Sequence, residues 1–419
     1  EEIDLVIVNF YPFENILKNT KNHSKIIENI DVGGPTMVRA AAKNYNFVTV
    51  ITKPSQYLSL IDELNYNKGS TSLKFRQKMS ESAFIETAYY DSIIANYFNN
   101  FSNNKFPKKK VLHGHLLDKL RYGENPHQEG AIYSKDSDFK LKQLNGKLLS
   151  YNNYNDIFSA LSISKSLPKN RGTVIVKHAN PCGVSINKNK LKSYSLALKC
   201  DPISAYGGIV SCNFKINKKL ALELNKIFLE AIIGNGIDKN ALKILKRKKN
   251  LRILDAKNLK LNDAQNIITN FGSFLIQSVD NKSFSKKDFK IVSKRKPDKK
   301  TFENLLFAFN VCRFVKSNAI VLVNNDSTVG IGSGQPSRLD SCKIAISKMK
   351  QFNCFKNNSK IIAASDAFFP FIDGFETLVS SGVSAVIQPS GSIRDKEIIK
   401  FANQTNTILI FSKTRHFRH

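Results

Sequence analysis

The sequence has no uninterrupted run of 18 apolar residues, no tryptophan, and no Cys-x-x-Cys pair among its six cysteines. A membrane-spanning helix needs about 20 predominantly apolar residues, so no membrane span is expected. No signal peptide is recognisable. The irregular cysteine spacing favours reduced thiols in a cytoplasmic protein over disulfides or a zinc site. The cysteines are Cys182, Cys200, Cys212, Cys312, Cys342 and Cys354.

Acidic residues are scarce, because 64 lysines and arginines stand against 34 aspartates and glutamates, a net charge of +30. Such a surplus fits a nucleic-acid-binding protein, whose affinity would fall steeply with salt. The basic residues are instead spread along the chain, and no RNA- or DNA-binding motif is visible. We attribute the charge to compositional bias and small anionic ligands, and expect no specific nucleic-acid partner and no membrane partner.

Length and periodicity predict an α/β protein with more than one domain. Short apolar runs alternate with segments of helical periodicity, and the polar, basic stretch 103–110 predicts a linker. We therefore expect domains at 1–110 and 111–419. Strands are predicted at 3–9, 47–51, 173–176, 209–212, 251–255, 319–323, 361–364, 384–387 and 407–411. Helices are predicted after residue 35 and at 75–98, 217–231 and 301–313.

The segment Lys177-His-Ala-Asn-Pro-Cys-Gly183 directly follows a predicted strand. Ligands of open α/β sheets bind at the carboxyl ends of strands, and a lysine with a histidine offers a cation and a group that titrates near neutrality. The alternative is a polar strand end with a Pro-Gly turn. Zinc is not expected, because the zinc-deaminase signature also requires a glutamate after the histidine and a second cysteine.

Four further segments combine polar groups with turn formers or aromatics. In Leu120–Gln128 an arginine and a tyrosine suit a phosphate and a flat ring, unless the segment is only a structured loop. Glycines in Gly330–Arg338 allow close approach to a ligand or form a β-turn. Ser365–Asp373 predicts either an apolar slot or core packing, and the tail Arg415–His419 suggests a docked terminus.

In this order, the motifs resemble the bifunctional AICAR transformylase/IMP cyclohydrolase family. The resemblance spans residues 1–419. It also includes Asn9–Phe13, Asp31–Pro35, Arg39–Asn44, Asp201–Gly208, Ser317–Ala319 and Gln388–Asp395. It implies transfer of a formyl group from 10-formyltetrahydrofolate to aminoimidazole carboxamide ribotide (AICAR), giving FAICAR in de novo purine biosynthesis. The second activity closes FAICAR to IMP. An inactive structural relative remains the alternative, and the intact Lys177, His178 and Asn318 argue against it.

The resemblance also implies the architecture. Residues 1–110 would be the later part of a cyclohydrolase domain with a methylglyoxal-synthase-like fold. Residues 111–419 would be a transformylase domain of two cytidine-deaminase-like α/β units without zinc. A homodimer with transformylase sites across its interface is expected. Because the family's opening segments are not matched, we expect ring closure to be impaired in this chain.

The resemblance assigns roles to individual residues. His178 is the candidate general base, while Lys177 and Asn318 would stabilise charge on the formyl oxygen or assist the leaving group. Asp373 would contact the folate pterin, and Asp366 matches a position that touches a monovalent cation in some family members. The ribotide would be held by Arg121, Tyr122, Asn153, Asp201, Arg338, Phe368, Arg415 and Phe417. The matching cyclohydrolase residues are Tyr11, Asp31 and Lys43.

Overall fold

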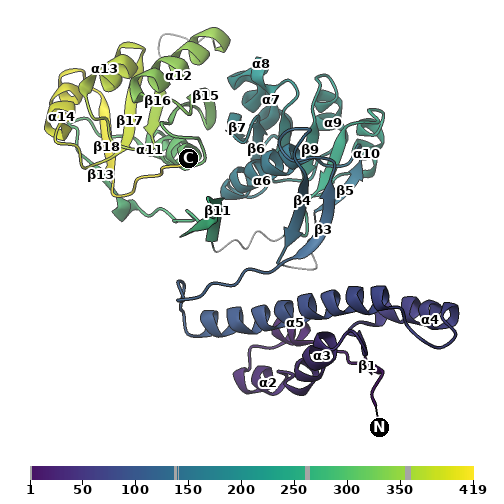
Figure 1. Cartoon of the computed structure of the whole chain (residues 1–419). Helices are drawn as coiled ribbons and strands as arrows, with labels where there is room; N and C mark the ends of the chain where they lie inside the picture. The colour runs from purple at the N-terminus through teal and green to yellow at the C-terminus, as the bar shows by residue number, and fades with distance from the viewer. Residues whose placement is uncertain (1, 136–138, 140, 260–264, 354–359) are drawn as a thin grey trace. The chain divides into compact units, whose positions relative to one another are not determined.

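The computed structural model describes residues 2–135, 139, 141–259, 265–353 and 360–419. The chain divides into two compact units. Unit 1 is Glu1–His115 with Tyr133–Ser137, and unit 2 is Leu116–Ile132 with Asp138–His419 (Figure 1). Each unit has hydrophobic clusters of its own.

Unit 1 is mainly helical. Its strands β1 (Leu5–Ile7) and β2 (Thr49–Ile51) pair in parallel. The long helix α5 (Leu73–Phe101) begins where the Ser72 hydroxyl accepts a hydrogen bond from the backbone N–H of Phe75, an N-cap that satisfies one of the free donors of the first turn. The other helices are α1 (Phe13–Asn19), α2 (His23–Glu28), α3 (Gly33–Lys43), η1 (Pro54–Gln56) and α4 (Tyr57–Tyr66).

Unit 2 is built on a 12-stranded mixed sheet with the order β13-β18-β17-β16-β14-β15-β7-β6-β8-β9-β10-β5. The first-half strands are β5 (Lys142–Asn145), β6 (Gly172–Val176), β7 (Pro181–Ile186), β8 (Ile209–Cys212), β9 (Ala231–Gly234) and β10 (Arg252–Asp255). The second-half strands are β13 (Phe289–Ile291), β14 (Ile320–Asn324), β15 (Ser327–Gly332), β16 (Ile361–Ser365), β17 (Val383–Pro389) and β18 (Ile408–Ser412).

The two halves of this sheet repeat one topology. Read outward from the centre, β7-β6-β8-β9-β10-β5 corresponds to β15-β14-β16-β17-β18-β13. Each corresponding pair of neighbours is parallel or antiparallel in the same way. The halves join through antiparallel pairing of β7 with β15. The predicted α/β class is confirmed in this coarse form, as a mixed sheet with helices.

Helices cover both faces of the sheet (Figure 1). One face carries α6 (Tyr151–Ser166) and α11 (Lys299–Cys312) over a single hydrophobic cluster that spans both halves. The opposite face has separate clusters under α7, α9 and α10 in the first half and under α12, α13 and α14 in the second. Those helices are α7 (Lys190–Cys200), α9 (Lys218–Leu224), α10 (Lys239–Leu245), α12 (Arg338–Phe352), α13 (Ile372–Ser380) and α14 (Asp395–Gln404).

Periodicity located seven of the strands of this sheet, and β8 matches its predicted bounds. The predicted helix at 217–231 was wrong at its end, because α9 stops at Leu224 and β9 begins at Ala231. The turn considered at Pro181–Gly183 is the start of strand β7, where proline is tolerated as the first residue. The strands without a prediction are β3 (His115–Leu120), β4 (Gly130–Ser134), β5, β7, β9, β11 (Gln265–Asn270), β12 (Ser273–Ser278), β13 and β15.

Among the described residues, no helix is both long and apolar enough to cross a membrane. Five cysteines are buried and free of disulfides, namely Cys182, Cys200, Cys212, Cys312 and Cys342. Burial raises the pKa of the Cys182 and Cys200 thiols to about 12, so these side chains behave as small apolar groups. Cys354 lies outside the described residues.

Candidate active site

The topology of unit 2 brings two distant motifs to one edge of the sheet. Lys177 and His178 follow the last residue of β6, and Asn318 precedes the first residue of β14. Three antiparallel pairings, β6–β7, β7–β15 and β15–β14, separate the two strands. Strand β14 therefore runs opposite to β6, and its beginning lies at the edge where β6 ends.

Hydrogen bonds join these two motifs directly. The Asn180 side-chain oxygen accepts from the backbone N–H of Lys316 at 2.9 Å. Ser317 and Arg418 exchange backbone and hydroxyl bonds, with Ser317 N–H donating to the Arg418 carbonyl at 2.9 Å and Arg418 N–H donating to Ser317 Oγ at 3.1 Å. The segment before β14 is thus tied both to the turn after β6 and to the C-terminal tail, which is docked as predicted.

Helix α6 fixes the turn that carries His178. Asp156 Oδ1 accepts from the backbone N–H of Ala179 at 2.6 Å, and Ser159 Oγ donates to the Ala179 carbonyl at 2.8 Å. The other Asp156 oxygen lies 3.9 Å from Nδ1 of His178. Burial raises the pKa of Asp156, although the Ala179 N–H and the charges of His178 and Lys177 oppose that rise. The His178 side chain is 83% exposed, so its ring is free to meet a substrate.

Asp156 has no counterpart among the predicted site residues. It lies three positions after Asn153 in α6, and residues three apart share one helix face. That spacing could have placed Asp156 on the same helix face as Asn153. It could not have shown that Asp156 contacts the turn that carries His178, which is distant in sequence.

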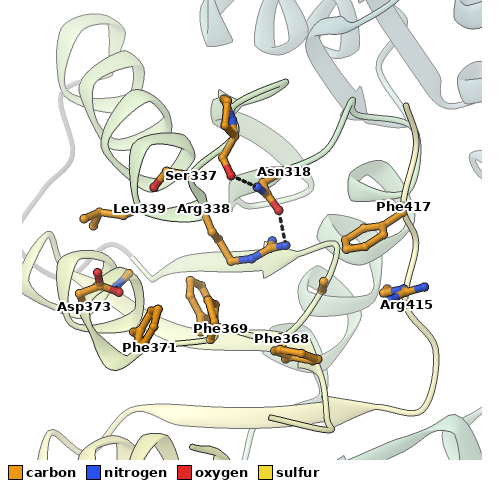
Figure 2. A pocket seen from close by; sticks show the side chains of 14 residues that line it. Asn318, Ser337, Arg338, Leu339, Phe368, Phe369, Phe371, Asp373, Arg415 and Phe417 are labelled. Atoms are coloured by element: carbon orange, nitrogen blue, oxygen red, sulfur yellow. Dashed lines mark hydrogen bonds between the residues drawn. The ribbon is translucent and has the colours of Figure 1, made fainter.

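A cavity of about 330 Å³ opens beside Asn318, at the N-terminal ends of α12 and α13 (Figure 2). Its wall combines apolar rings with a few polar groups, as ligand sites usually do. It brings together six of the predicted residues, namely Asn318, Arg338, Phe368, Asp373, Arg415 and Phe417. Arg415 and Phe417 line it from the C-terminal segment (Figure 2).

A buried ion pair organises the floor of this cavity. Arg338 is 7% exposed and pairs with Asp366, which is fully buried. The guanidinium also donates to Ser365 Oγ at 2.7 Å and to the Asn318 side-chain oxygen at 2.7 Å. The second carboxylate oxygen of Asp366 accepts from Ser317 Oγ at 2.6 Å. Arg338 and Asp366 are thus held in one network with the Asn318 segment.

The Asn318 amide is fully committed in one orientation. Its nitrogen donates to the carbonyls of Gln335 at 2.9 Å and Pro336 at 2.8 Å, while its oxygen accepts from Arg338 (Figure 2). On the other motif, Lys177 Nζ donates to the Tyr206 carbonyl at 2.6 Å. The amide nitrogen of Asn318 and the ammonium of Lys177 are therefore both held by backbone carbonyls.

Four predicted ribotide contacts do not line this cavity. Arg121 stacks over the ring of Tyr122 at 4.7 Å in an exposed loop. Asn153 is a capping residue, since its oxygen accepts from Ser150 N–H at the start of α6. Asp201 is paired with Lys348 Nζ at 2.7 Å. Although burial raises the pKa of Asp201, the hydrogen bonds from Lys348 and Ser204 lower it overall.

In unit 1, Asp31 organises the start of α3. Its carboxylate accepts from the backbone N–H groups of Gly34 at 2.8 Å and Tyr11 at 3.3 Å. A Cβ at position 34 would lie 2.5 Å from Asp31 Oδ2, so a larger residue there would displace the carboxylate from these hydrogen bonds. Lys43 ends the same helix and lies about 15 Å from its beginning at 1.5 Å per residue. The structure brings Tyr11 and Asp31 together, but not Lys43.

Among the described residues, no group of three or more His, Cys, Asp or Glu side chains could hold a metal ion. The monovalent cation considered at Asp366 receives no support, because both of its carboxylate oxygens are occupied by Arg338 and Ser317.

Comparison with known proteins settles the family. The profile of the AICARFT/IMPCHase bienzyme matches residues 41–348. The chain belongs to this family. Among its relatives is the bifunctional purine biosynthesis protein PurH of Persephonella marina, 43% identical over 429 residues that cover all of this chain and 82% of that protein. The PurH proteins of Rhizobium rhizogenes and Bradyrhizobium diazoefficiens are 40% and 42% identical and are covered to 80% and 81% of their length.

Membership of the AICARFT/IMPCHase family confirms the predicted class of enzyme, an AICAR formyltransferase and IMP cyclohydrolase of purine biosynthesis. The family implies a folate cosubstrate, and formyl transfer from a folate calls on positioned acids, bases and hydrogen-bond donors. The roles of individual residues do not follow from family membership alone.

Proposed function

We propose that the edge of the sheet formed by the ends of β6 and β14 is the formyl-transfer site of this AICARFT/IMPCHase family member. The observation that carries the proposal is the direct bonding of the Lys177–Asn180 turn to the Lys316–Asn318 segment. Together with the adjacent cavity, it gathers a general base, charge-stabilising donors and an apolar slot for a ring. AICAR and 10-formyltetrahydrofolate are the two substrates.

The exposed ring of His178 takes a proton from the amine of AICAR as that nitrogen attacks the formyl carbon. Lys177, which keeps two N–H groups beyond its bond to the Tyr206 carbonyl, stabilises the negative charge that develops on the formyl oxygen. Asn318 does so when its amide nitrogen exchanges one of its two backbone acceptors for that oxygen. The bond from the formyl carbon to N10 of the folate then breaks, and that nitrogen takes up a proton. A histidine suits this role because its ordinary pKa lies near neutrality.

In the cavity beside Asn318, Phe368 and Phe417 would pack against the ribotide, whose phosphate would be met by Arg415. The side chain of Asp373 would accept hydrogen bonds from the pterin. Arg121 and Tyr122 do not line this cavity in their own chain, so they would complete ribotide binding across the interface of a homodimer. Asp201 and Asn153 would support the surrounding backbone. Phe369 and Phe371 add apolar wall to the same cavity.

The repeated strand order of unit 2 supports two similar α/β units of the cytidine-deaminase type in the transformylase domain 111–419. A homodimer is consistent with the 83% exposure of His178. Proton transfer and charge stabilisation are stronger where water is excluded, and a second subunit could cover the ring. Residues 1–110 would supply Tyr11, Asp31 and Lys43 to a methylglyoxal-synthase-like cyclohydrolase domain.

The test is formyl transfer by the purified chain. AICAR and 10-formyltetrahydrofolate are supplied together and singly, and the formation of tetrahydrofolate and FAICAR is followed. We expect equal amounts of both products only when both substrates are present. Release of tetrahydrofolate without FAICAR would contradict the assignment, and ring closure is read separately from the formation of IMP out of added FAICAR.

Replacing Asn318 with alanine is expected to lower kcat for formyl transfer by about 10²–10³-fold, the usual loss when one charge-stabilising donor is removed. The measurement is steady-state kinetics with both substrates varied. Asn318→Asp keeps the size of the side chain but removes its donor, so it should be as impaired as the alanine variant. Full activity of the aspartate variant would exclude a donor role for this amide.

Asp156→Ala is expected to lower kcat/KM for formyl transfer more than Asp156→Asn does. Asparagine keeps an oxygen that can accept the hydrogen bond from the backbone N–H of Ala179, whereas alanine leaves the turn that carries His178 without that bond. The measurement is steady-state kinetics of both variants at one pH. Equal losses in the two variants would exclude a positioning role for this hydrogen bond.

A further inference from the structure

A second cavity lies in the first half of unit 2 and contains none of the residues assigned to formyl transfer. Its volume is about 430 Å³. The wall is formed by the last turn of α6, by the turn before β6, and by the segments that leave β8, β9 and β10. Strands β8, β9 and β10 are parallel neighbours. The cavity therefore lies at the carboxyl ends of parallel strands, where open α/β sheets bind ligands.

The internal repeat relates this position to the cavity beside Asn318. Asn318 lies two residues before β14, and Asn170 lies two residues before the corresponding strand β6. The residues just after β16 and β18 line one cavity, and those just after β8 and β10 line the other. The remaining wall differs between the two cavities. Helices α12 and α13 line the cavity beside Asn318, whereas the end of α6 lines the second cavity.

The chemistry of the second cavity selects an anion. Among the residues that the structure describes, three lysines line it, Lys165, Lys169 and Lys257, and no aspartate or glutamate does. Lys169 and Lys257 have no side-chain hydrogen bond or ion pair with the described part of the chain, and Lys165 reaches only the carbonyl of Leu259. Partial burial lowers the pKa of Lys165. A bound anion would offset that desolvation.

The rest of the wall is rigid and partly apolar. The Asn213 amide donates to the carbonyls of Ser164 and Pro168, both at 3.0 Å, and its oxygen accepts from the backbone N–H of Gly172 at 2.8 Å. Buried Leu161 and Ile233 also line the cavity. Such a wall can pack against the uncharged part of a small organic molecule while the lysines bind its charged group.

We propose that this second cavity binds a phosphate monoester with an apolar or aromatic body, at a site separate from the formyl-transfer site. The lysines would hold the phosphate as point charges. The apolar wall would pack against the attached group. Because formyl transfer does not use the cavity, the proposal can be tested independently of the proposed function.

The test is residue-resolved acetylation of lysines by acetic anhydride, quantified by mass spectrometry on the intact chain. The ligands are adenosine 5′-monophosphate, inorganic phosphate and adenosine. The monophosphate should slow acetylation of Lys165, Lys169 and Lys257, by about tenfold at ten times its Kd. Phosphate should protect more weakly and adenosine should not protect. Lys218 and Lys219, exposed on α9, are the reference positions.

The variant K169E/K257E should lose the protection of Lys165 while formyl transfer stays unchanged. The matched variant K218E/K219E alters the net charge equally and should keep the protection. Equal protection of the reference lysines, or none anywhere, would overturn the proposal. If adenosine protected the lysines as strongly as its monophosphate, the assignment to a phosphate group would be overturned. If inorganic phosphate protected them as strongly as the monophosphate, the proposed contact with an apolar or aromatic body would be overturned.

Discussion

Replacing His178 with alanine is expected to lower formyl transfer about 10²–10⁴-fold, the usual contribution of a positioned general base. The side chain is 83% exposed, and an Asp156 oxygen lies 3.9 Å from its Nδ1. Its loss should therefore leave the fold intact. The measurement is single-turnover formation of FAICAR at neutral pH, alongside thermal unfolding of the same preparation.

Two observations separate a base from a merely structural residue. Added imidazole should restore part of the activity of the His178→Ala variant, because a small base can diffuse to an exposed position. The residual activity should also lose the acid limb of its pH profile. An unfolding temperature that falls with the activity, or an unchanged pH profile, would instead give His178 a structural role.

Replacing Arg338 with methionine is expected to destabilise unit 2 by about 3–5 kcal/mol, because the buried carboxylate of Asp366 would lose its partner. The pair is nearly inaccessible to solvent, with exposures of 7% and 0%. The variant would also lose the bond to Asn318, so formyl transfer should fall as well. The measurement is calorimetric or denaturant unfolding, with the transition of unit 2 followed.

A double-mutant cycle makes this prediction specific. The variant R338M/D366N has no isolated buried charge and should recover much of the stability lost by R338M alone. Arg394→Met serves as the surface control, since Arg394 and Glu397 form an exposed pair. Its cost should stay within about 1 kcal/mol. Equal effects of R338M and R394M would show that burial of the ion pair contributes nothing.

Local sequence patterns predicted most of the central strands and the types of residue that form the site. Strands β8 and β16 are fully buried short runs of apolar and small residues, which periodicity detects. Strand β7 escaped because Pro181 and Gly183 favour a turn when read locally. Tertiary packing favours the strand instead. Gly183 lies so close to the Ala197 carbonyl that a Cβ would be 1.9 Å from its oxygen.

The hydrogen-bond partners of the site residues were harder to predict from the sequence. Asp366 was considered for a cation, yet it pairs with Arg338, 28 positions away. Asp156 was not singled out at all, because its significance depends on Ala179 and His178 lying across from α6. A carboxylate near the start of a helix is usually a solvated or capping group, and only the neighbouring turn distinguishes this one.

By itself, the sequence determined the alternating α/β pattern, the placement of Lys177 and His178 at a strand end, and the motif order that indicates the family. Only the tertiary structure decided that Asn318 reaches the same edge, that Arg338 is neutralised by Asp366, and that two halves of one sheet share a topology. The reason is physical. Periodicity records which face of an element is buried, whereas the pairing of β7 with β15 joins segments more than 100 residues apart, and no local pattern encodes such a partner.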